Sequence, residues 1–371
     1  MKQLITSIGL MSGTSGDGID ISTIQSDGED KLVLLGDYYY KYSDNFKTEI
    51  MSLKDKILKK EDLTKHEKII KELERKITTT HAFAVEESLE KFKINRKEIN
   101  IVGFHGQTLF HSFRDKISKQ IADGKLLSNL IKIDVVNDFR SSDINNGGQG
   151  APLTPIYHSL IQKIKNIKTP VAFVNIGGIA NITYIGSDSK LLSFDTGPGN
   201  SLIDRFIKTK SNNKINFDEE GKTASRGTVD EIIIESYLND PYYEMKPPKT
   251  LDINDFTISL IRGLSYENSV ATLTELTART IVNSFFLVPE KPKKILLCGG
   301  GRKNKFLVER IKKLSQIEIV NIDEYKLDGD FTESQAFAYL AIRTLLKKPI
   351  SFPETTGVKN SLTGGKISKI R

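Results

Sequence analysis

The sequence predicts an α/β protein built from two related domains. Strand-like apolar runs alternate with amphipathic helical segments, and each half opens with a three-strand meander whose first turn is rich in glycine. The 371 residues also suit two or three domains of about 100–200 residues each. We therefore expect one domain over residues 1–137, a second over 138–346, and a C-terminal tail, 347–371, that packs back on the first.

The elements of the first half follow from local patterns. Apolar runs broken by Gly, Asp and Ser predict the first meander. Apolar residues at near-helical spacing among Lys and Glu predict one or two amphipathic helices between residues 60 and 92. The other expected elements are strands at 4–11, 19–24, 31–40, 101–104 and 132–136, and a short helix at 126–131.

The second half repeats the opening pattern. A loop at 141–151, rich in Gly, Asn and Asp, marks a crossing between domains. The elements expected after it are strands at 171–176, 179–185, 191–194 and 294–297, and helices at 201–209, 272–286, 305–314 and 333–346. A tail rich in Pro, Gly and Thr ends the chain.

Composition and charge argue against several classes of protein. There are 54 Lys and Arg against 47 Asp and Glu, so the net charge is +7. Lys and Glu alternate along the same stretches, which argues against a nucleic-acid partner and mildly favours anionic small molecules. Cys298 is the only cysteine, so no internal disulfide can form and a reducing compartment is the simplest expectation. The sequence shows no signal peptide and no membrane span, so we expect a cytoplasmic protein.

The first glycine-rich turn, at residues 9–20, is suited to phosphate. Backbone N–H groups can close around an anion where glycine leaves room, and the Thr and Ser hydroxyls add donors. Asp17 or Asp20 can hold Mg²⁺ through its water ligands. The alternative is an ordinary hairpin turn. The residues that would face the phosphates are Gly13, Thr14, Ser15, Gly16, Asp17, Gly18, Ile19 and Asp20.

The second meander offers a matching turn and a carboxylate. Gly177 and Gly178 occupy the equivalent turn, and a triphosphate between two domains needs a hairpin from each. Asp195 ends an apolar strand just before a glycine turn and a helix, so it is placed to be exposed in a cleft while the helix N-terminus faces an anion. The alternative for Asp195 is a helix N-cap.

Polar side chains gather around two further segments of the first half. Asp138, Arg140 and Asp143 precede a Gly-Gly-Gln-Gly run, which suits a hydroxylated and partly anionic substrate because Arg can grip a carboxylate through two bonds. A structural salt bridge between Arg140 and Asp143 is the alternative. His105 and Gln107 follow a buried strand and can enter the same cleft, although His105 also fits an ordinary core position.

Two motifs near the C-terminus complete the set. Gly299, Gly300 and Gly301 follow a buried strand and can let a flat base lie on bare backbone, or can simply form a tight turn. Glu333 begins the last strong helix, where it can point inward or merely interact with the helix dipole.

Taken together, these motifs closely resemble the anhydro-N-acetylmuramic acid kinases of bacterial cell-wall recycling. The match runs in family order along almost the whole chain. Two positions depart from it: Gly16 stands where a larger apolar residue is expected, and the stretch around Glu333 matches only loosely. The matching stretches are 9–20, 103–108, 138–155, 175–183, 194–204, 216–227, 247–249, 298–304 and 333–341.

The resemblance implies an actin/hexokinase-like (ribonuclease H-like) fold, with two related domains that flank an ATP cleft and close on substrate. It implies that Mg²⁺-bound ATP, water and 1,6-anhydro-N-acetylmuramic acid give ADP and N-acetylmuramic acid 6-phosphate. It also implies a homodimer. The implied base is Asp195, the implied sugar contacts are His105, Gln107, Asp138, Arg140 and Glu333, and the implied nucleotide contacts are the three glycine turns.

Two other functions fit parts of the pattern. A related kinase of a plain hexose or a carboxylate would need a base that deprotonates its acceptor rather than water. An actin-like filament or an ATP-gated sensor would use the same cleft but would not need a substrate loop. The density of polar residues over 138–149 argues against the second alternative.

Overall fold

The computed structural model describes residues 3–252 and 255–370 and divides the chain into two compact units. Unit 1 holds the chain up to Asn166 and from Phe331 onward, and unit 2 runs from Ile167 to Asp330. These boundaries differ from the predicted ones at 137/138 and 346/347. Residues 138–166 and the last long helix, which we assigned to the second domain, belong to unit 1.

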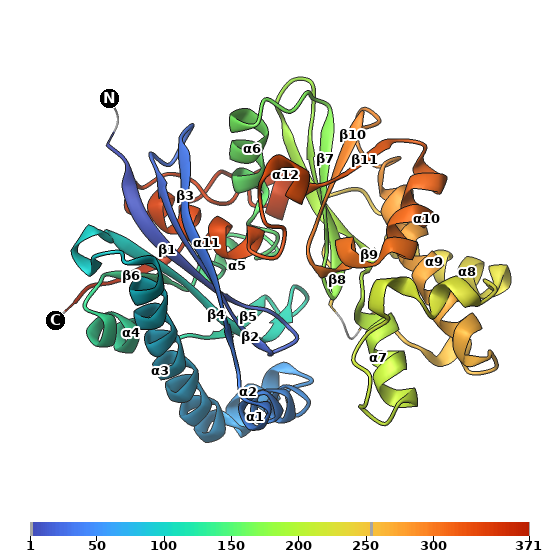
Figure 1. Cartoon of the computed structure of the whole chain (residues 1–371), viewed down its shortest axis with the longest axis horizontal. Coiled ribbons are helices and arrows are strands. Elements are labelled where there is room, and N and C mark those ends of the chain that lie inside the picture. Colours follow the sequence, from blue (N-terminus) through green and yellow to red (C-terminus); the bar gives the residue numbers. More distant parts are fainter. Residues whose placement is uncertain (1–2, 253–254, 371) are drawn as a thin grey trace. The chain divides into compact units, whose positions relative to one another are not determined.

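Unit 1 is built on one mixed sheet with the order β12-β6-β4-β1-β2-β3, and β5 pairs with β4 (Figure 1). β1, β2 and β3 are antiparallel neighbours, whereas β4 and β6 run parallel to β1 and to each other. The strands are β1 (Ile5–Ser12), β2 (Gly18–Ser26), β3 (Leu32–Lys41), β4 (Ile101–Ser112), β5 (Ile117–Ile121), β6 (Val135–Asn137) and β12 (Lys366–Ser368).

The two faces of this sheet are covered by different helices. Ile8 and Leu10 of β1 share an apolar core with Leu73 of α3, while α11 packs on the face to which Gly9 points. A Cβ on Gly9 would lie 1.9 Å from the Ser334 carbonyl oxygen of α11. This close packing explains why α11 joins unit 1. The helices are α1 (Asp44–Lys54), α2 (Lys60–Lys65), α3 (Glu67–Phe92), α4 (Gly124–Ile131), α5 (Ser141–Asn145), α6 (Pro155–Ile164), α11 (Thr332–Leu345) and α12 (Pro353–Thr356).

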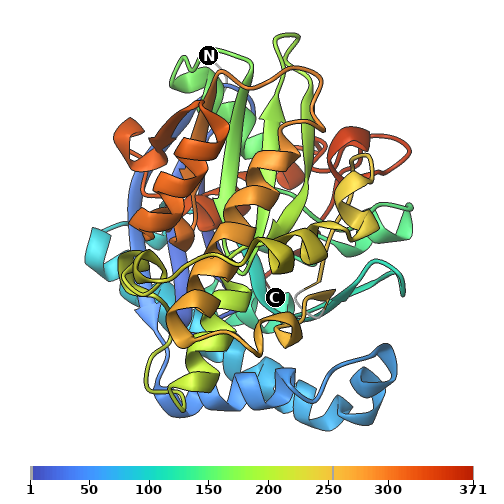
Figure 2. The ribbon, with the colours of Figure 1, turned by 90° about the vertical axis from the view of Figure 1, so that its right-hand side faces the viewer.

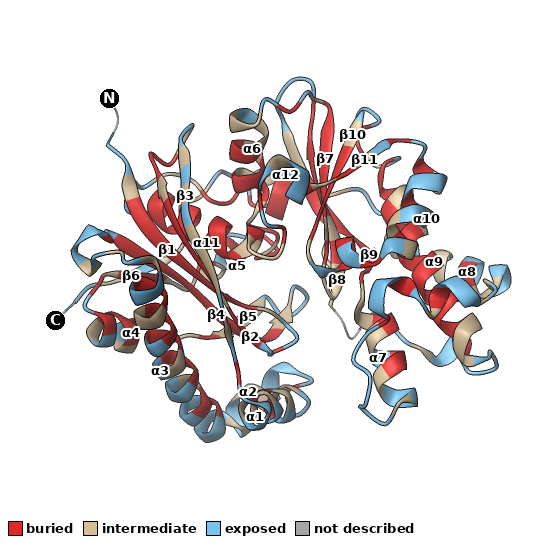
Figure 3. Cartoon of the chain, viewed as in Figure 1, coloured by how far each residue is buried: buried red, intermediate tan, exposed pale blue. Residues whose placement is uncertain are grey.

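Unit 2 has a five-stranded sheet with the order β11-β10-β7-β8-β9. Figure 2 shows α9 and α10 side by side in front of its strands, and Figure 3 shows that α9 is buried along much of its length. The elements are β7 (Val171–Ile176), β8 (Ile179–Ile185), β9 (Leu191–Pro198), β10 (Lys294–Cys298), β11 (Glu318–Asn321), α7 (Ser201–Lys210), α8 (Glu231–Leu238), α9 (Tyr266–Ser284) and α10 (Lys305–Ser315), with short 3₁₀ turns that include η4 (Pro241–Glu244) and η7 (Gly300–Lys303).

The two units share one topology. The order β3-β2-β1-β4-β6 in unit 1 matches β9-β8-β7-β10-β11 in unit 2, with three antiparallel strands followed by two parallel ones in both. This repeat confirms the predicted fold class, an α/β protein with two related domains. Among the described residues, no helix combines the length and the apolar character needed to cross a membrane.

Candidate active site

The β1–β2 turn of unit 1 presents polar groups at an exposed tip. Thr14, Ser15 and Asp17 are exposed, and Ser15 Oγ donates to the Asp17 carboxylate at 2.7 Å. Gly16 has a φ of +60°, which a larger residue adopts only with strain. Ile19, in contrast, is fully buried in the core of unit 1, so it can offer only its backbone.

Gln107 supports this turn from β4. Its Nε2 donates to the Gly13 carbonyl oxygen at 2.9 Å, and its Oε1 lies 2.8 Å from Ser12 Oγ. The Ser12 hydroxyl also lies 2.9 Å from the Gly18 carbonyl oxygen across the hairpin. Gln107, which we predicted to contact the sugar, therefore stabilises the β1–β2 turn. Its side chain is buried.

His105 and Arg140 lie together in unit 1. His105 Nδ1 is 2.9 Å from the Gly106 carbonyl oxygen, and Nε2 is 3.1 Å from Arg140 Nη2. Burial and the Arg140 charge lower the pKa of His105 to about 3, so the ring is neutral and accepts from the guanidinium. Arg140 Nη1 donates to the Gly150 carbonyl oxygen at 2.8 Å. His105 thus holds Arg140 in place.

The neighbouring carboxylates have other partners. Asp143 accepts from the Gly150 N–H at 2.6 Å and from Thr356 Oγ1 at 2.5 Å, instead of forming the salt bridge that was the alternative for Arg140. Asp138 has a φ of +54° and pairs with Lys366 of β12 at 2.6 Å. Asp138 is therefore fixed between the loop and the C-terminal strand.

Asp195 lies near the end of β9 in unit 2 and is 8% exposed. Its Oδ2 accepts from the Leu251 N–H at 2.9 Å, its own N–H donates to the Lys249 carbonyl oxygen at 3.0 Å, and its carbonyl oxygen accepts from Tyr242 Oη at 2.6 Å. The residue belongs to the strand and is not the N-cap of α7, a position that Asn200 holds. The N-cap alternative is therefore wrong.

The β7–β8 turn is tied to the start of α7. The N–H groups of Gly199 and Ser201 donate to the Gly178 carbonyl oxygen, and the Asn200 N–H donates to that of Gly177 at 2.8 Å. These N–H groups at the start of α7 therefore fix the β7–β8 turn. Glycine is required at 199, where a Cβ would lie 2.2 Å from the Gly177 carbonyl oxygen.

The glycine triplet divides into two packed residues and one open one. A Cβ on Gly299, whose φ is +72°, would lie 2.3 Å from Asn175 Oδ1, and one on Gly301 would lie 2.3 Å from Ile176 Cγ2. At Gly300 a Cβ would meet no atom within 4 Å. Gly300 is therefore the member of the triplet at which a ligand can reach bare backbone.

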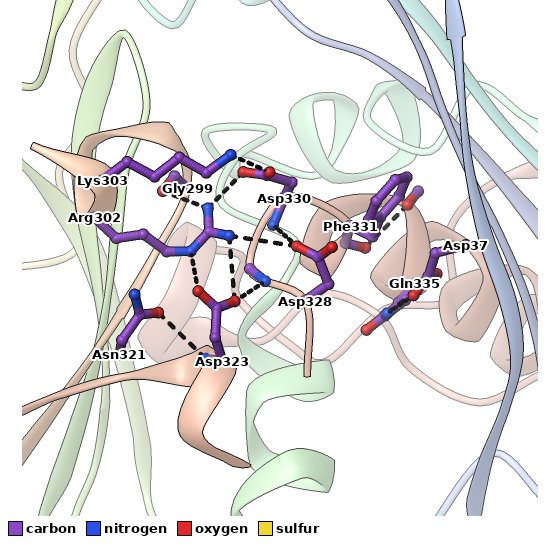
Figure 4. Close-up of polar contacts among 12 residues, drawn as sticks. Asp37, Gly299, Arg302, Lys303, Asn321, Asp323, Asp328, Asp330, Phe331 and Gln335 are labelled. Atoms are coloured by element: carbon purple, nitrogen blue, oxygen red, sulfur yellow. Dashed lines mark hydrogen bonds and ion pairs between the residues drawn. The ribbon is translucent and has the colours of Figure 1, made fainter. Parts of the chain in front are cut away.

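A buried arginine holds this triplet (Figure 4). Arg302 donates to the Gly299 carbonyl oxygen at 3.1 Å, and its guanidinium contacts Asp323 through two nitrogens. Asp328 and Asp330 complete the cluster. Burial of the guanidinium among three carboxylates fixes the turn because breaking one pair would strand a buried charge.

Glu333 lies in the first turn of α11 in unit 1 and is partly buried. The same turn carries Gln335, whose Nε2 donates to both carboxylate oxygens of Asp37 at 3.0 and 3.2 Å (Figure 4). Ser22 Oγ also donates to Asp37, at 2.6 Å. This partly buried network connects α11 to β2 and β3.

Sequence reasoning missed two residues beside Asp195. Tyr242 and Lys249 lie far from it in the sequence, and no periodic pattern marks them. A signal was available, however, since 247–249 is one of the stretches that match the family and holds a buried lysine after two prolines. Lys249 is 3% exposed.

The groups of each unit suit different chemistry. Unit 1 offers an exposed turn with hydroxyls for an anion and a guanidinium fixed by a neutral histidine. Unit 2 offers a carboxylate whose orientation is set by backbone bonds, and a glycine triplet with one open position. A carboxylate held in this way can accept a proton from a substrate or from water.

Solved structures that the chain matches include component A of the (R)-2-hydroxyglutaryl-CoA dehydratase from Acidaminococcus fermentans. It is 11% identical, with a TM-score of 0.46, and the match covers 92% of this chain and 100% of that one. A ROK family glucokinase from Streptomyces griseus, solved in complex with glucose and AMPPNP, is 12% identical, with a TM-score of 0.41 and coverage of 91% and 99%.

Sequence comparisons are far more specific. The family model described as anhydro-N-acetylmuramic acid kinase matches residues 5–369. A protein of that name from Pelagibacter ubique (strain HTCC1062) is 47% identical over 100% of both chains, and one from Zymomonas mobilis is 40% identical over 98% of this chain and 99% of its own. With a match along nearly its whole length, the chain belongs to the anhydro-N-acetylmuramic acid kinase family of enzymes.

Proposed function

We propose that this protein phosphorylates 1,6-anhydro-N-acetylmuramic acid at O6 with ATP and opens the anhydro bridge with water, in the recycling of cell-wall sugars. The observation that carries the proposal is Asp195, a buried strand-end carboxylate in a chain that matches the kinase family over residues 5–369. The products are ADP and N-acetylmuramic acid 6-phosphate.

Asp195 acts as the general base in this proposal. It takes a proton from a water molecule, whose oxygen attacks the anomeric carbon C1 while the C1–O6 bond breaks. The released O6 takes the γ-phosphoryl group, and the bond from the γ-phosphorus to the ADP oxygen breaks. Because the phosphoryl group captures O6, no separate acid is needed to protonate it, and one carboxylate suffices.

The three glycine turns bind ATP. The exposed hydroxyls of Thr14 and Ser15 and the backbone of Gly13–Asp20 would contact the phosphates, with Gly177 and Gly178 contributing from unit 2 and Gly300 accepting the adenosine portion. Mg²⁺ would neutralise phosphate charge. Asp17 or Asp20 would hold it through its water ligands. No cluster of three or more metal-binding side chains occurs in residues 3–252 and 255–370.

Arg140 binds the carboxylate of the sugar's lactyl group. Its guanidinium is oriented by His105 Nε2 and the Gly150 carbonyl oxygen, and such preorganisation favours a two-bonded carboxylate contact. His105 and Gln107 then assist indirectly, through Arg140 and through the β1–β2 turn. Asp138 and Glu333 remain proposed contacts of the sugar hydroxyl and amide groups. We further propose a homodimer, as the family resemblance implies, and a cytoplasmic location, as expected from the sequence.

A substrate panel tests this function. The purified protein is incubated with Mg²⁺-ATP and, in turn, the anhydro-sugar, N-acetylmuramic acid and glucose, while ADP release is followed. We expect rapid ADP release with the anhydro-sugar alone. Equal or faster turnover of an open sugar would identify a plain sugar kinase. Absence of turnover with all three, together with sedimentation that depends on ATP, would support a filament or sensor instead.

A further inference from the structure

One segment of unit 2 surrounds Asp195. Three contacts join the two: Tyr242 Oη donates to the Asp195 carbonyl oxygen at 2.6 Å, the Asp195 N–H donates to the Lys249 carbonyl oxygen at 3.0 Å, and the Leu251 N–H donates to Asp195 Oδ2 at 2.9 Å. The last bond touches the carboxylate itself. The path of residues 242–251 therefore sets where that carboxylate points.

Lys249 ties the two ends of this segment together. Its Nζ donates to the Tyr242 carbonyl oxygen at 2.6 Å and to that of Tyr243 at 3.3 Å. It also lies over the Tyr242 ring, 4.3 Å from the centroid, and 5.8 Å from the centroid of Phe194, the residue before Asp195 on β9. Carbonyl oxygens and ring faces attract a cation, so these contacts favour the protonated amine.

Burial opposes the same charge. Lys249 is 3% exposed, and this burial lowers the pKa of its ammonium to about 8. Its Nζ contacts two titratable residues of η4, Tyr242 and Tyr243, and a third, Asp195 of β9, contacts its backbone. Burial first, and then nearby carboxylates, raise the pKa of both tyrosines above the usual range, so they stay protonated near pH 8. The carboxylates that act on them are Asp195 and Asp255 for Tyr242, and Asp240 for Tyr243.

We propose that the protonated ammonium of Lys249 is a positioning group for Asp195, which it orients by holding residues 242–251 closed around the end of β9. The inference rests on the proposed function, in which Asp195 is the general base. A base displaced by about 1 Å from its working position can lose about 10²-fold in rate. Loss of the Lys249 charge should therefore slow turnover without weakening the binding of either substrate.

The test compares pH profiles of kcat between about pH 6 and pH 10. We expect kcat of the parent enzyme to fall as pH rises past about 8, where Lys249 loses its proton. Lys249→Met should lower kcat by about 10- to 100-fold at pH 7, leave both KM values within about twofold, and abolish the fall near pH 8. Lys249→Arg keeps its charge throughout this range, so its kcat should show no fall near pH 8. Lys246→Met, at an exposed lysine of the same segment, is the matched control and should keep the parent profile.

The outcomes separate the inference from the proposed function. A parent profile without a fall near pH 8, or a Lys249→Arg profile identical to the parent's, would overturn the positioning role, even where Lys249→Met fails to fold. Asp195→Asn is measured alongside. If Asp195→Asn is inactive while the Lys249 variants keep the parent profile, the inference alone fails. If Asp195→Asn is as fast as the parent, the proposed function itself fails.

Discussion

The two meanders of the molecule each carry one aspartate on their third strand, and the two aspartates are held in different ways. Asp37 of β3 accepts from the side chains of Ser22 and Gln335. Asp195 of β9 accepts at Oδ2 from a backbone N–H, that of Leu251. The third strand of each meander therefore holds a carboxylate, at different registers: Asp37 pairs with Ser22 of β2 and ties elements together, whereas Asp195 pairs with Asn181 of β8 and is the proposed base.

The first turns of the meanders differ as well. In unit 1 the turn projects hydroxyls and a carboxylate at an exposed tip. In unit 2 the turn is two residues long and its carbonyl oxygens accept from the first amides of α7. One topology, used twice, thus presents different groups: exposed hydroxyls in the β1–β2 turn of unit 1, and in unit 2 a turn whose carbonyl oxygens are bonded to N–H groups at the start of α7.

The largest difference should appear when each of the two aspartates is replaced by asparagine in a separate variant. Asp195→Asn should lower kcat by about 10²–10⁴-fold, the usual contribution of a general base, while both KM values change little. The asparagine oxygen can still accept from the Leu251 N–H, so the fold should survive. Asp37→Asn should instead lower the free energy of unfolding by about 1–3 kcal/mol, because the asparagine NH₂ group would face the donors of Ser22 and Gln335. It should leave kcat within about threefold. Steady-state kinetics and chemical unfolding measure both. Loss of activity in Asp37→Asn with normal turnover in Asp195→Asn would reverse the assignment.

Arg140→Ala in unit 1 should act on binding. A charge-assisted contact contributes about 1.5–3 kcal/mol, so the sugar KM should rise by about 10- to 100-fold while the ATP KM stays within about twofold. His105→Gln, which keeps an acceptor near the guanidinium, should raise the sugar KM less. Equal increases in both KM values would favour a structural role for Arg140.

Two glycine variants test whether both units contact the nucleotide. A Cβ on Gly13 would meet nothing closer than Ser15 Oγ at 3.8 Å, and one on Gly300 would meet nothing within 4 Å. Gly13→Val and Gly300→Val should therefore fold normally and raise the ATP Kd by about tenfold, equivalent to about 1.4 kcal/mol. Gly263→Val, at another open and exposed position, is the control. Calorimetry showing parent-like affinity in a folded Gly13→Val or Gly300→Val protein would remove that turn from the site.

The smallest expected effect is on stability alone and comes from Asp204 of α7, a helix that we expect to take no part in the reaction. Burial, and then the charge of Asp218, raise the pKa of Asp204 to about 7, against the partial opposing effect of Lys208. The raised pKa means that the folded protein favours the protonated form. The resulting stability is fully present below about pH 4 and is lost as pH rises toward 7. Relative to Asp204→Asn, the parent should thus lose about 1–2 kcal/mol between pH 4 and pH 8, with kcat unchanged. Parallel stability curves for the two proteins would contradict this.

The meanders and the candidate base were predictable because their signals are local. Alternating apolar runs broken by glycine predicted β1–β3 and β7–β9, and a carboxylate at a strand end before a glycine turn pointed to Asp195. Short elements without periodicity, such as β5, α6, α8 and β11, were missed. The predicted loop at 141–151 contains α5, and the predicted tail contains α12 and β12.

Contacts between residues far apart in the sequence explain the other differences between the prediction and the structure. Nothing in the local pattern of α11 shows which sheet it covers, and the clue lay in Gly9 and Gly103, small residues on the strands that it crosses. The Arg302 cluster joins η7 to the carboxylates of residues 323–330, and the Lys249 carbonyl oxygen accepts from the Asp195 N–H although 54 residues separate the two. Periodicity and spacing carry no record of such contacts, so local patterns alone could not reveal them.

The most direct test of the central claim is mass spectrometry of the product formed from ATP and the anhydro-sugar in ¹⁸O-labelled water. We predict one ¹⁸O atom at the anomeric carbon, an unlabelled phosphate on O6, and no remaining anhydro bridge. A phosphorylated product that keeps the bridge and carries no label at the anomeric carbon, or label found only in free phosphate, would contradict the proposed reaction.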